Sequence, residues 1–176
     1  MAAIAALLDS CVLYPARLRD LLLSLAAAGL FHPIWSDIIH EKWMTNVLVN
    51  RPDLTRAQLE AARSAMERAF PTAAVSGFES LIPAVNLPDP DDRHVLAAAL
   101  HAGADLIITV NLKDFPTAAL SPYSIVAAHP DPFVDYLFDL DKPEAIAATA
   151  RMPAACERRR SAQTISLTPL PRSECP

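Results

Sequence analysis

Apolar residues along the chain fall into short continuous runs and into longer stretches with helical spacing. A buried strand is predicted for Ile4–Leu8, which is apolar throughout and ends at Asp9. Two further short apolar runs predict strands at residues 105–109 and 124–127. The loop-like, proline-containing region 72–90 has room for one more short strand near residues 73–75.

Helical spacing of leucine and other apolar residues separates these runs. Each helical stretch opens at a residue that favours a helix start and closes at glycine or proline: Pro15 to Gly29, Ser36 or Asp37 to Pro52, Thr55 to Pro71, and Asp91-Asp92 to Gly103. Strands that alternate with helices indicate an α/β fold with a parallel sheet.

The C-terminal part of the chain differs in composition. Residues 143–160 are rich in alanine and end in Arg158-Arg159-Arg160, which predicts one more helix. Residues 161–176 contain several prolines and no periodic pattern, which predicts a flexible tail that is dispensable for folding.

The composition fits one ordinary domain. The chain has 176 residues, of which 52% are hydrophobic and 20% charged, and this excludes a wholly disordered protein. Its three cysteines are far apart and form no Cys-x-x-Cys pair, so a zinc knuckle or a disulfide framework is not expected and a reducing cytoplasm fits best. No stretch reaches the ~18 apolar residues of a membrane helix, and the apolar N-terminus lacks a basic flank, so neither a membrane anchor nor a secretory signal is expected.

The net charge of −5 argues at first against a nucleic-acid partner. Its distribution qualifies that conclusion, because acidic residues dominate the first 150 residues and basic residues the remainder. An acidic body is most simply a solvated surface, but it is also what a cluster of carboxylates around a divalent cation would produce.

The positions of the carboxylates favour such a cluster. Asp9 directly follows the first predicted strand, Asn111 and Asp114 follow the strand at 105–109, Asp92 opens the helix before that strand, and Glu41 lies early in another helix. Ligands collect beyond the carboxyl ends of parallel strands, and oxygen ligands suit Mg²⁺ or Mn²⁺. Each residue taken alone is more simply explained as a helix cap, a first-turn acid or a turn residue, and only the set together favours a site.

Four ordered segments resemble the PIN domain family, and within it the VapC-like toxins of bacterial toxin–antitoxin pairs. The resemblance spans roughly residues 3–128 and is carried by Leu8-Asp9-Ser10-Cys11-Val12-Leu13-Tyr14-Pro15, by Ile39-His40-Glu41-Lys42-Trp43, by residues 89–99 and by residues 103–116. Each segment alone has little specificity, whereas the ordered set is specific.

The resemblance implies a three-layer fold, with a short central parallel sheet flanked by helices, over residues 1–130. Residues 131–160 would then form a C-terminal helical extension and residues 161–176 a tail. It also implies a cytoplasmic endoribonuclease that depends on Mg²⁺ or Mn²⁺. The expected partners are an RNA substrate and an antitoxin protein, with a homodimer as an assembly to test and no membrane.

Carried over position by position, the resemblance makes Asp9, Glu41 and Asp92 the main metal-site carboxylates, with Asp91 as the close alternative to Asp92. The family usually has an aspartate directly after the closing strand, where this chain has Asn111, and Asp114 could compensate as a metal ligand. The expected catalytic set is therefore Asp9, Glu41, Asp92, Asn111 and Asp114. Residues expected to attract RNA are Ser10, Lys42, Arg93, Lys113 and the run Arg158-Arg159-Arg160.

Two other functions stay open at this point. A PIN module with weak nuclease activity could act by binding RNA or a protein, and Asn111 is the residue that favours it. A phosphatase of the haloacid dehalogenase type would need a second aspartate two residues after Asp9, where this chain has Cys11.

Overall fold

The computed structural model describes residues 4–152. Its centre is a sheet of five parallel strands in the order β3-β2-β1-β4-β5. The strands are β1 (Ile4–Leu8), β2 (Phe31–Ser36), β3 (Ala74–Val75), β4 (Leu106–Ile108) and β5 (Val126–Ala128). The most central strand, β1, is the one that ends at Asp9.

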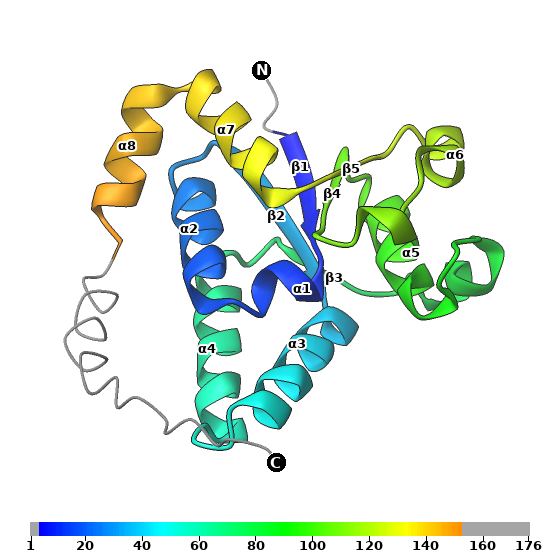
Figure 1. The fold of residues 1–176 in the computed structure, drawn as a ribbon, viewed down its shortest axis with the longest axis horizontal. Coiled ribbons are helices and arrows are strands. Elements are labelled where there is room, and N and C mark those ends of the chain that lie inside the picture. The colour runs from blue at the N-terminus through cyan, green and yellow to red at the C-terminus, as the bar shows by residue number, and fades with distance from the viewer. Residues whose placement is uncertain (1–3, 153–176) are drawn as a thin grey trace, which may run out of the picture.

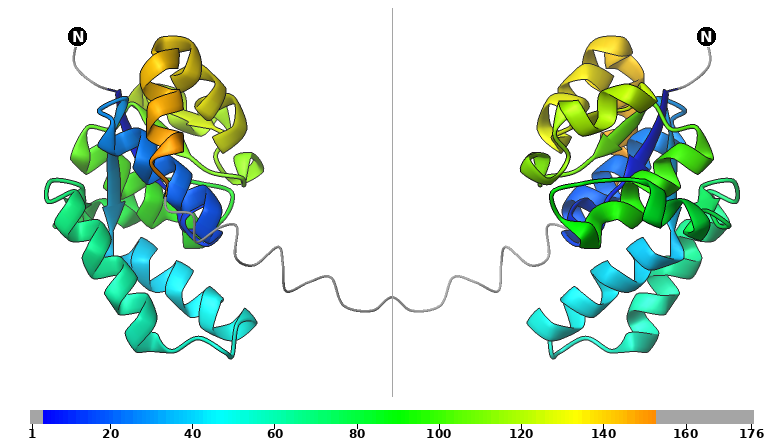
Figure 2. Two further views of the ribbon diagram at one scale, coloured as in Figure 1. Left: turned by 90° about the vertical axis from the view of Figure 1, so that its left-hand side faces the viewer. Right: turned by 90° about the vertical axis from the view of Figure 1, so that its right-hand side faces the viewer.

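Helices cover both faces of this sheet. They are α1 (Ser10–Leu13), α2 (Ala16–Ala27), α3 (Asp37–Asn50), α4 (Arg56–Ala69), α5 (Arg93–Ala102), α6 (Thr117–Leu120), α7 (Pro130–Leu140) and α8 (Lys142–Ala150). Short 3-10 turns lie at Glu79–Ala84, Pro90–Asp92, Leu112–Asp114 and Ser121–Tyr123. Figures 1 and 2 show α2, α7 and α8 on one side of the sheet and α5 on the other. The predicted three-layer α/β fold is confirmed.

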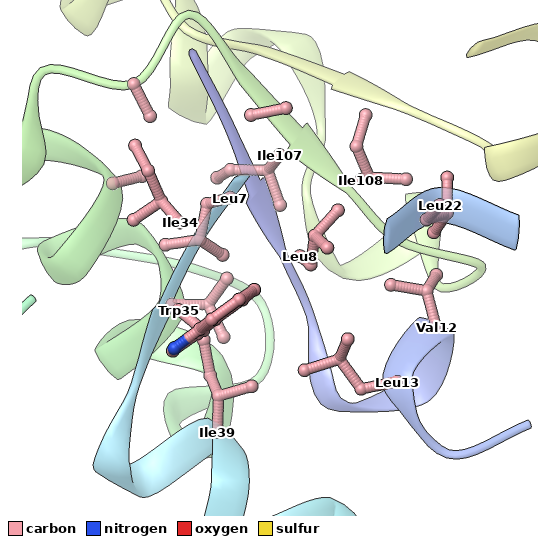
Figure 3. Close-up of a cluster of buried hydrophobic side chains, with 14 of the residues drawn as sticks. Leu7, Leu8, Val12, Leu13, Leu22, Ile34, Trp35, Ile39, Ile107 and Ile108 are labelled. Carbon is pink, nitrogen blue, oxygen red and sulfur yellow. The ribbon is translucent and has the colours of Figure 1, made fainter. Parts of the chain in front are cut away.

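Side chains of the central strands pack into one apolar core. Leu7 of β1 is in register with Ile34 and Ile107, and Leu8 with Ile108, and all of these side chains are buried. Figure 3 shows Leu8 and Ile108 on the side of the sheet that faces Leu22 of α2, whereas Leu7 and Ile34 lie on the other side of β1. Strands buried on both faces are expected to be continuous apolar runs, which explains why β1 could be found from its composition alone.

The helix ends follow local rules that the sequence displays. The Ser36 hydroxyl accepts the Ile39 N–H at 3.3 Å and caps α3. Thr55 and Gln58 form a reciprocal capping box at the start of α4. Gly103 ends α5 with a φ of +65°, a left-handed conformation that glycine adopts without strain.

The strand β2 was not predicted, because it contains Pro33 and shows no clear alternation. Proline cannot donate a ladder hydrogen bond, so it argues against a strand inside a sheet. The N–H of Trp35 donates to Ala73 O at 3.0 Å on the β3 side. The nitrogen of Pro33, two residues before Trp35, faces the same side of β2. Because β3 begins only opposite Trp35, Pro33 lies ahead of the first residue of β3. No strand of residues 4–152 pairs with β2 at that position, so the missing N–H of Pro33 costs no hydrogen bond in the described sheet.

The C-terminal region also differs from the prediction of one helix at residues 143–160. It holds two helices, α7 and α8, which meet at Asp141, and α8 ends at Ala150. Alanines of α8 are buried where it packs on α2, and the ring of Phe133 in α7 lies 5.1 Å from that of Phe31 in β2. Arg158-Arg159-Arg160 and the predicted tail at residues 161–176 lie outside the described residues. The proposed domain limits stay predictions.

Among the helices of residues 4–152, none has the length and apolar character that a membrane crossing requires.

Candidate active site

The fold places the candidate site where the sheet changes direction. The chain passes from β1 to β2 on one side and returns to β4 on the other side of β1, so the switch point lies between β1 and β4. Ligands of open α/β sheets bind beyond the carboxyl ends of the strands at such a point. Asp9 follows β1 there, and Thr109 follows β4.

Asp9 is held rigidly at this point. Its side chain is only 4% exposed, and its Oδ2 accepts a hydrogen bond of 2.9 Å from the Thr109 hydroxyl. Its Oδ1 accepts the Ser10 N–H at 2.6 Å and lies 3.2 Å from the Ser10 hydroxyl. These donors stabilise an ionised carboxylate, because a buried charge needs hydrogen-bond partners. Asp9 therefore points a fixed negative charge at the end of the sheet.

Cys11 lies beside the same carboxylate. Its Sγ is 3.2 Å from Asp9 Oδ2 and 3.3 Å from the Thr109 hydroxyl oxygen. Burial, reinforced by the charge of Asp9, raises the pKa of the Cys11 thiol to about 11. The sulfur is therefore protonated at neutral pH, which makes it a hydrogen-bond donor to Asp9 and a poor nucleophile.

Asp92 is the second carboxylate of this end of the sheet. Its side chain is 15% exposed, at the start of α5. Burial raises the pKa of the Asp92 carboxyl, and the negative charge of Asp9 raises it further, so the two carboxylates lie close enough to repel one another. The Lys42 ammonium lies 3.5 Å from Asp92 Oδ1 and lowers this pKa in part. Asp91 is exposed instead, and its backbone carbonyl accepts a 2.8 Å hydrogen bond from Lys42.

Glu41 lies on the exposed surface of α3 and is engaged by a cation. Its two oxygens accept hydrogen bonds of 2.8 and 2.6 Å from the guanidinium of Arg56 in α4. This pairing lowers the pKa of the Glu41 carboxyl. Arg56 also bonds Glu60, and Thr45 lies 3.3 Å from Glu41 Oε1. The hydrogen-bond partners of the Glu41 carboxylate among the described residues are Arg56 and Thr45, and neither of them bonds Asp9 or Asp92.

The loop after β4 brings Asn111 toward the same centre. The Asn111 N–H donates to the Thr109 hydroxyl oxygen at 3.1 Å, and that hydroxyl in turn bonds Asp9. The loop then curls into the 3-10 turn Leu112–Asp114, where the Asp114 N–H bonds Asn111 O at 3.0 Å. Asn111 is exposed and Asp114 half-buried. No described residue hydrogen-bonds either side chain, so both can turn to a ligand.

The residues expected to attract RNA differ in whether their side chains contact the carboxylates. Ser10 and Lys42 adjoin the carboxylates, and Lys113 is exposed on the turn after β4. Arg93 is half-buried and its guanidinium lies 3.3 Å from Asn86 Oδ1.

The donor set fits a hard divalent cation in part. Asp9 and Asp92 supply two carboxylates that repel one another, and a bound cation would reduce this repulsion. Carboxylate oxygens are the ligands that Mg²⁺ and Mn²⁺ prefer. Residues 4–152 contain no group of three or more His, Cys, Asp or Glu side chains arranged as metal ligands. A third carboxylate would have to come from Glu41 after release from Arg56, or from Asp114.

Thr109 is the residue of this centre that sequence reasoning missed. It is fully buried, and its hydroxyl joins Asp9 to the backbone of Asn111. A polar residue at the carboxyl end of an otherwise apolar, β-branched run is the signal that could have identified it.

Comparisons with known proteins agree with the resemblance described above. A family model described as PIN domain matches residues 5–113, well over half of the chain. Asp9, Glu41, Asp92 and Asn111 fall inside this range, and Asp114 lies just beyond it.

A curated protein of Mycobacterium tuberculosis named "Putative ribonuclease VapC50" is 51% identical over 69 residues. That alignment covers 39% of this chain and 40% of the relative's length. No solved structure matches. The family match over most of the described fold shows that the chain belongs to the PIN domain family.

Proposed function

We propose that this protein is an endoribonuclease that hydrolyses RNA phosphodiester bonds with Mg²⁺ or Mn²⁺ and acts as the toxin of a toxin–antitoxin pair. One observation carries the proposal. Asp9 and Asp92, from different elements, lie at the switch point of a parallel sheet, close enough that the charge of one raises the pKa of the other. Membership of the PIN family and similarity to a protein named as a ribonuclease support it.

Asp9 and Asp92 are the residues that would hold the cation, with Glu41 and Asp114 as further ligands. When bound there, a divalent cation supplies a hydroxide at neutral pH and offsets the charge that develops on the phosphoryl oxygens. Asn111 contributes a neutral carbonyl that can orient water, but it adds no negative charge.

The chain's own groups perform the positioning. Thr109 and the Ser10 N–H fix the orientation of Asp9, so its charge needs no reorganisation when substrate arrives. The Lys42 ammonium, beside Asp92, is placed to bind a phosphate oxygen of the RNA backbone. Lys113 adds positive charge at the rim, whereas Arg93 would have to leave Asn86 to reach RNA.

A second function is favoured by specific observations. The family's usual fourth aspartate is Asn111 here, and Glu41 is neutralised by Arg56. These features would leave the centre short of negative charge, so the chain could bind RNA without cleaving it efficiently.

Substitution of Asp9 by Asn separates the two functions. The wild type should cleave RNA only when Mg²⁺ or Mn²⁺ is present, and Asp9→Asn should lower the rate at least ~100-fold through loss of electrostatic stabilisation. Asp135→Asn, the same change on the exposed surface of α7, should leave cleavage unchanged. Wild-type RNA binding without metal-dependent cleavage would instead establish the binding function.

The toxin role rests on the resemblance and needs its own test. Expression of the chain alone should arrest bacterial growth, and co-expression of the protein encoded beside it should restore growth by forming a complex. Growth that is unaffected by a cleavage-competent chain would remove the toxin assignment and leave the nuclease. The mass of the purified chain in solution would decide between a monomer and a homodimer.

A further inference from the structure

A hollow of about 440 Å³ opens beside the carboxylate pair. It lies between the start of α1 and the exposed face of α3, and it is lined by Ser10, Ile38, Glu41, Lys42, Thr45 and Asn46. The residues of α3 in this set are spaced as neighbours on one helix face. The volume lies at the lower end of the range of small-ligand pockets.

The hollow is continuous with the candidate active site. Ser10, on one wall, has its hydroxyl 3.2 Å from Asp9 Oδ1. Lys42, on the opposite wall, lies 3.5 Å from Asp92 Oδ1. A phosphodiester bound at Asp9 and Asp92 would therefore have the hollow next to it, within reach of the adjoining nucleoside.

The floor and walls combine an apolar surface with unused hydrogen-bonding groups. Ile38 supplies the apolar surface. No described residue hydrogen-bonds the Asn46 carboxamide, which presents both a donor and an acceptor at an exposed position. Thr45 directs its hydroxyl hydrogen to Glu41, so its oxygen keeps lone pairs for a donor in the hollow.

The charge of the hollow does not repel RNA. Glu41, its one acidic residue, is neutralised by two hydrogen bonds from Arg56. Lys42 adds a positive charge on the side of the carboxylate pair. A polar but uncharged ligand attached to a phosphate fits this distribution.

We propose that this hollow binds one nucleobase next to the scissile phosphate, and that Asn46 and Thr45 read its edge. The proposal rests on the proposed ribonuclease function and names a specificity subsite for it. Proteins read single-stranded RNA by placing unstacked bases against side chains that hydrogen-bond their edges, and a carboxamide matches a base edge with adjacent donor and acceptor.

Binding without cleavage tests the subsite directly. Fluorescent hexaribonucleotides that differ in one central base are titrated with the full chain in EDTA, and the anisotropy gives a Kd for each base. The wild type should prefer one base over the poorest by about fivefold or more. Asn46→Ala should reduce this ratio to less than about twofold. Asn50→Ala, the same change one turn further along α3 and outside the hollow, should preserve the ratio.

The outcomes distinguish failure of the subsite from failure of the nuclease. An equal base preference in wild type and Asn46→Ala, or no preference in the wild type, would overturn the subsite whatever the chain does with Mn²⁺. The wild type could show a base preference that Asn46→Ala loses and still never cleave RNA. That result would support the subsite and overturn the nuclease function. Cleavage maps with Mn²⁺ give a second readout, because Asn46→Ala should redistribute the cut sites that Asn50→Ala leaves in place.

Discussion

The hydroxyl of Thr109 connects the ends of two neighbouring strands. It donates to Asp9 Oδ2 at 2.9 Å and accepts the Asn111 N–H at 3.1 Å, in a fully buried position. Thr109→Val keeps the shape but leaves both groups without this partner. We expect a loss of about 1–3 kcal/mol in the free energy of unfolding and about tenfold weaker Mn²⁺ binding, since groups that orient a ligand carry such effects.

Thr109→Ser separates positioning from packing. Serine keeps the hydroxyl and removes a methyl group, so it should restore Mn²⁺ affinity while stability remains slightly reduced. Chemical denaturation and calorimetric titration measure the two quantities. If valine and serine weakened Mn²⁺ binding equally, packing rather than the hydroxyl would orient Asp9.

Asn111 decides how much negative charge the centre holds. Asn111→Asp should tighten Mn²⁺ binding by at least about tenfold, because each pair of opposite unit charges attracts with on the order of 4 kcal/mol at ~4 Å and an effective dielectric constant of ~20, and Mn²⁺ carries two charges. Asp114→Asn should weaken binding if its half-buried carboxylate is the compensating ligand. Calorimetric titration of both variants checks this, and unchanged affinity in both would restrict the cation site to Asp9, Asp92 and Glu41.

At the scale of elements, α4 matters because it carries Arg56, the residue that engages Glu41. Its start depends on the capping box of Thr55 and Gln58, in which Gln58 Oε1 accepts the Thr55 N–H at 2.8 Å. Thr55→Ala should lower the free energy of unfolding by about 1 kcal/mol and the Tm by roughly 2–4 °C.

A matched threonine controls for the substitution itself. Thr72 is exposed in the turn before β3 and takes part in no helix cap. Thr72→Ala should leave the Tm unchanged in the same thermal scan. A Thr55→Ala chain with wild-type Tm would mean that the capping box adds nothing to the packing of α4.

Elements that neighbouring residues in the sequence determine were predictable, whereas elements that depend on contacts between distant segments were not. The glycine that ends α5 and the caps of α3 and α4 follow from neighbouring residues. The strand β2 tolerates its proline because Pro33 lies opposite the chain before β3 begins, and this depends on how the two strands pair rather than on local sequence. The helix α7, which precedes the predicted helix at residues 143–160, was missed for a similar reason, since it is held by contacts such as Phe133 on Phe31.

The candidate site divides in the same way. Asp9 and Asp92 could be assigned to one end of the sheet because the end of the first strand and the start of the helix at Asp91-Asp92 are visible in the sequence. The pairing of Glu41 with Arg56 could not, because it depends on how α3 and α4 lie against each other. Thr109 was not predicted because the role of its hydroxyl depends on its contact with Asp9, which is distant in the sequence. The catalytic and metal-binding roles of all these residues stay predictions.

At the scale of the whole molecule, two buried histidines couple folding to pH. His40 is fully buried, with its Nδ1 accepting the Trp43 indole N–H at 2.9 Å, and His94 is 6% exposed. Burial lowers the pKa of each imidazole from 6.5 to about 4, and nearby Arg63 and Lys42, respectively, lower it further. Both rings are therefore neutral in the folded protein at neutral pH.

The sign of the pH effect follows from these values. As the pH falls below about 6.5, the unfolded chain binds two protons that the folded chain does not, so stability is lost progressively down to about pH 4. Between pH 7 and 5.5, each of these two histidines should cost about 1 kcal/mol. Urea denaturation at the two pH values measures this loss, expected at roughly 2 kcal/mol.

Single variants test whether the loss comes from these rings. His40→Leu and His94→Leu should each remove about half of the difference in unfolding free energy between pH 7 and 5.5, whatever their effect at pH 7 alone. Trp43→Phe removes the indole donor that bonds His40 Nδ1 but retains the imidazole of His40. This variant should therefore keep most of the pH dependence. A full pH difference in both leucine variants would assign the acid sensitivity to other groups, and the buried imidazoles would then have to be protonated in the folded state.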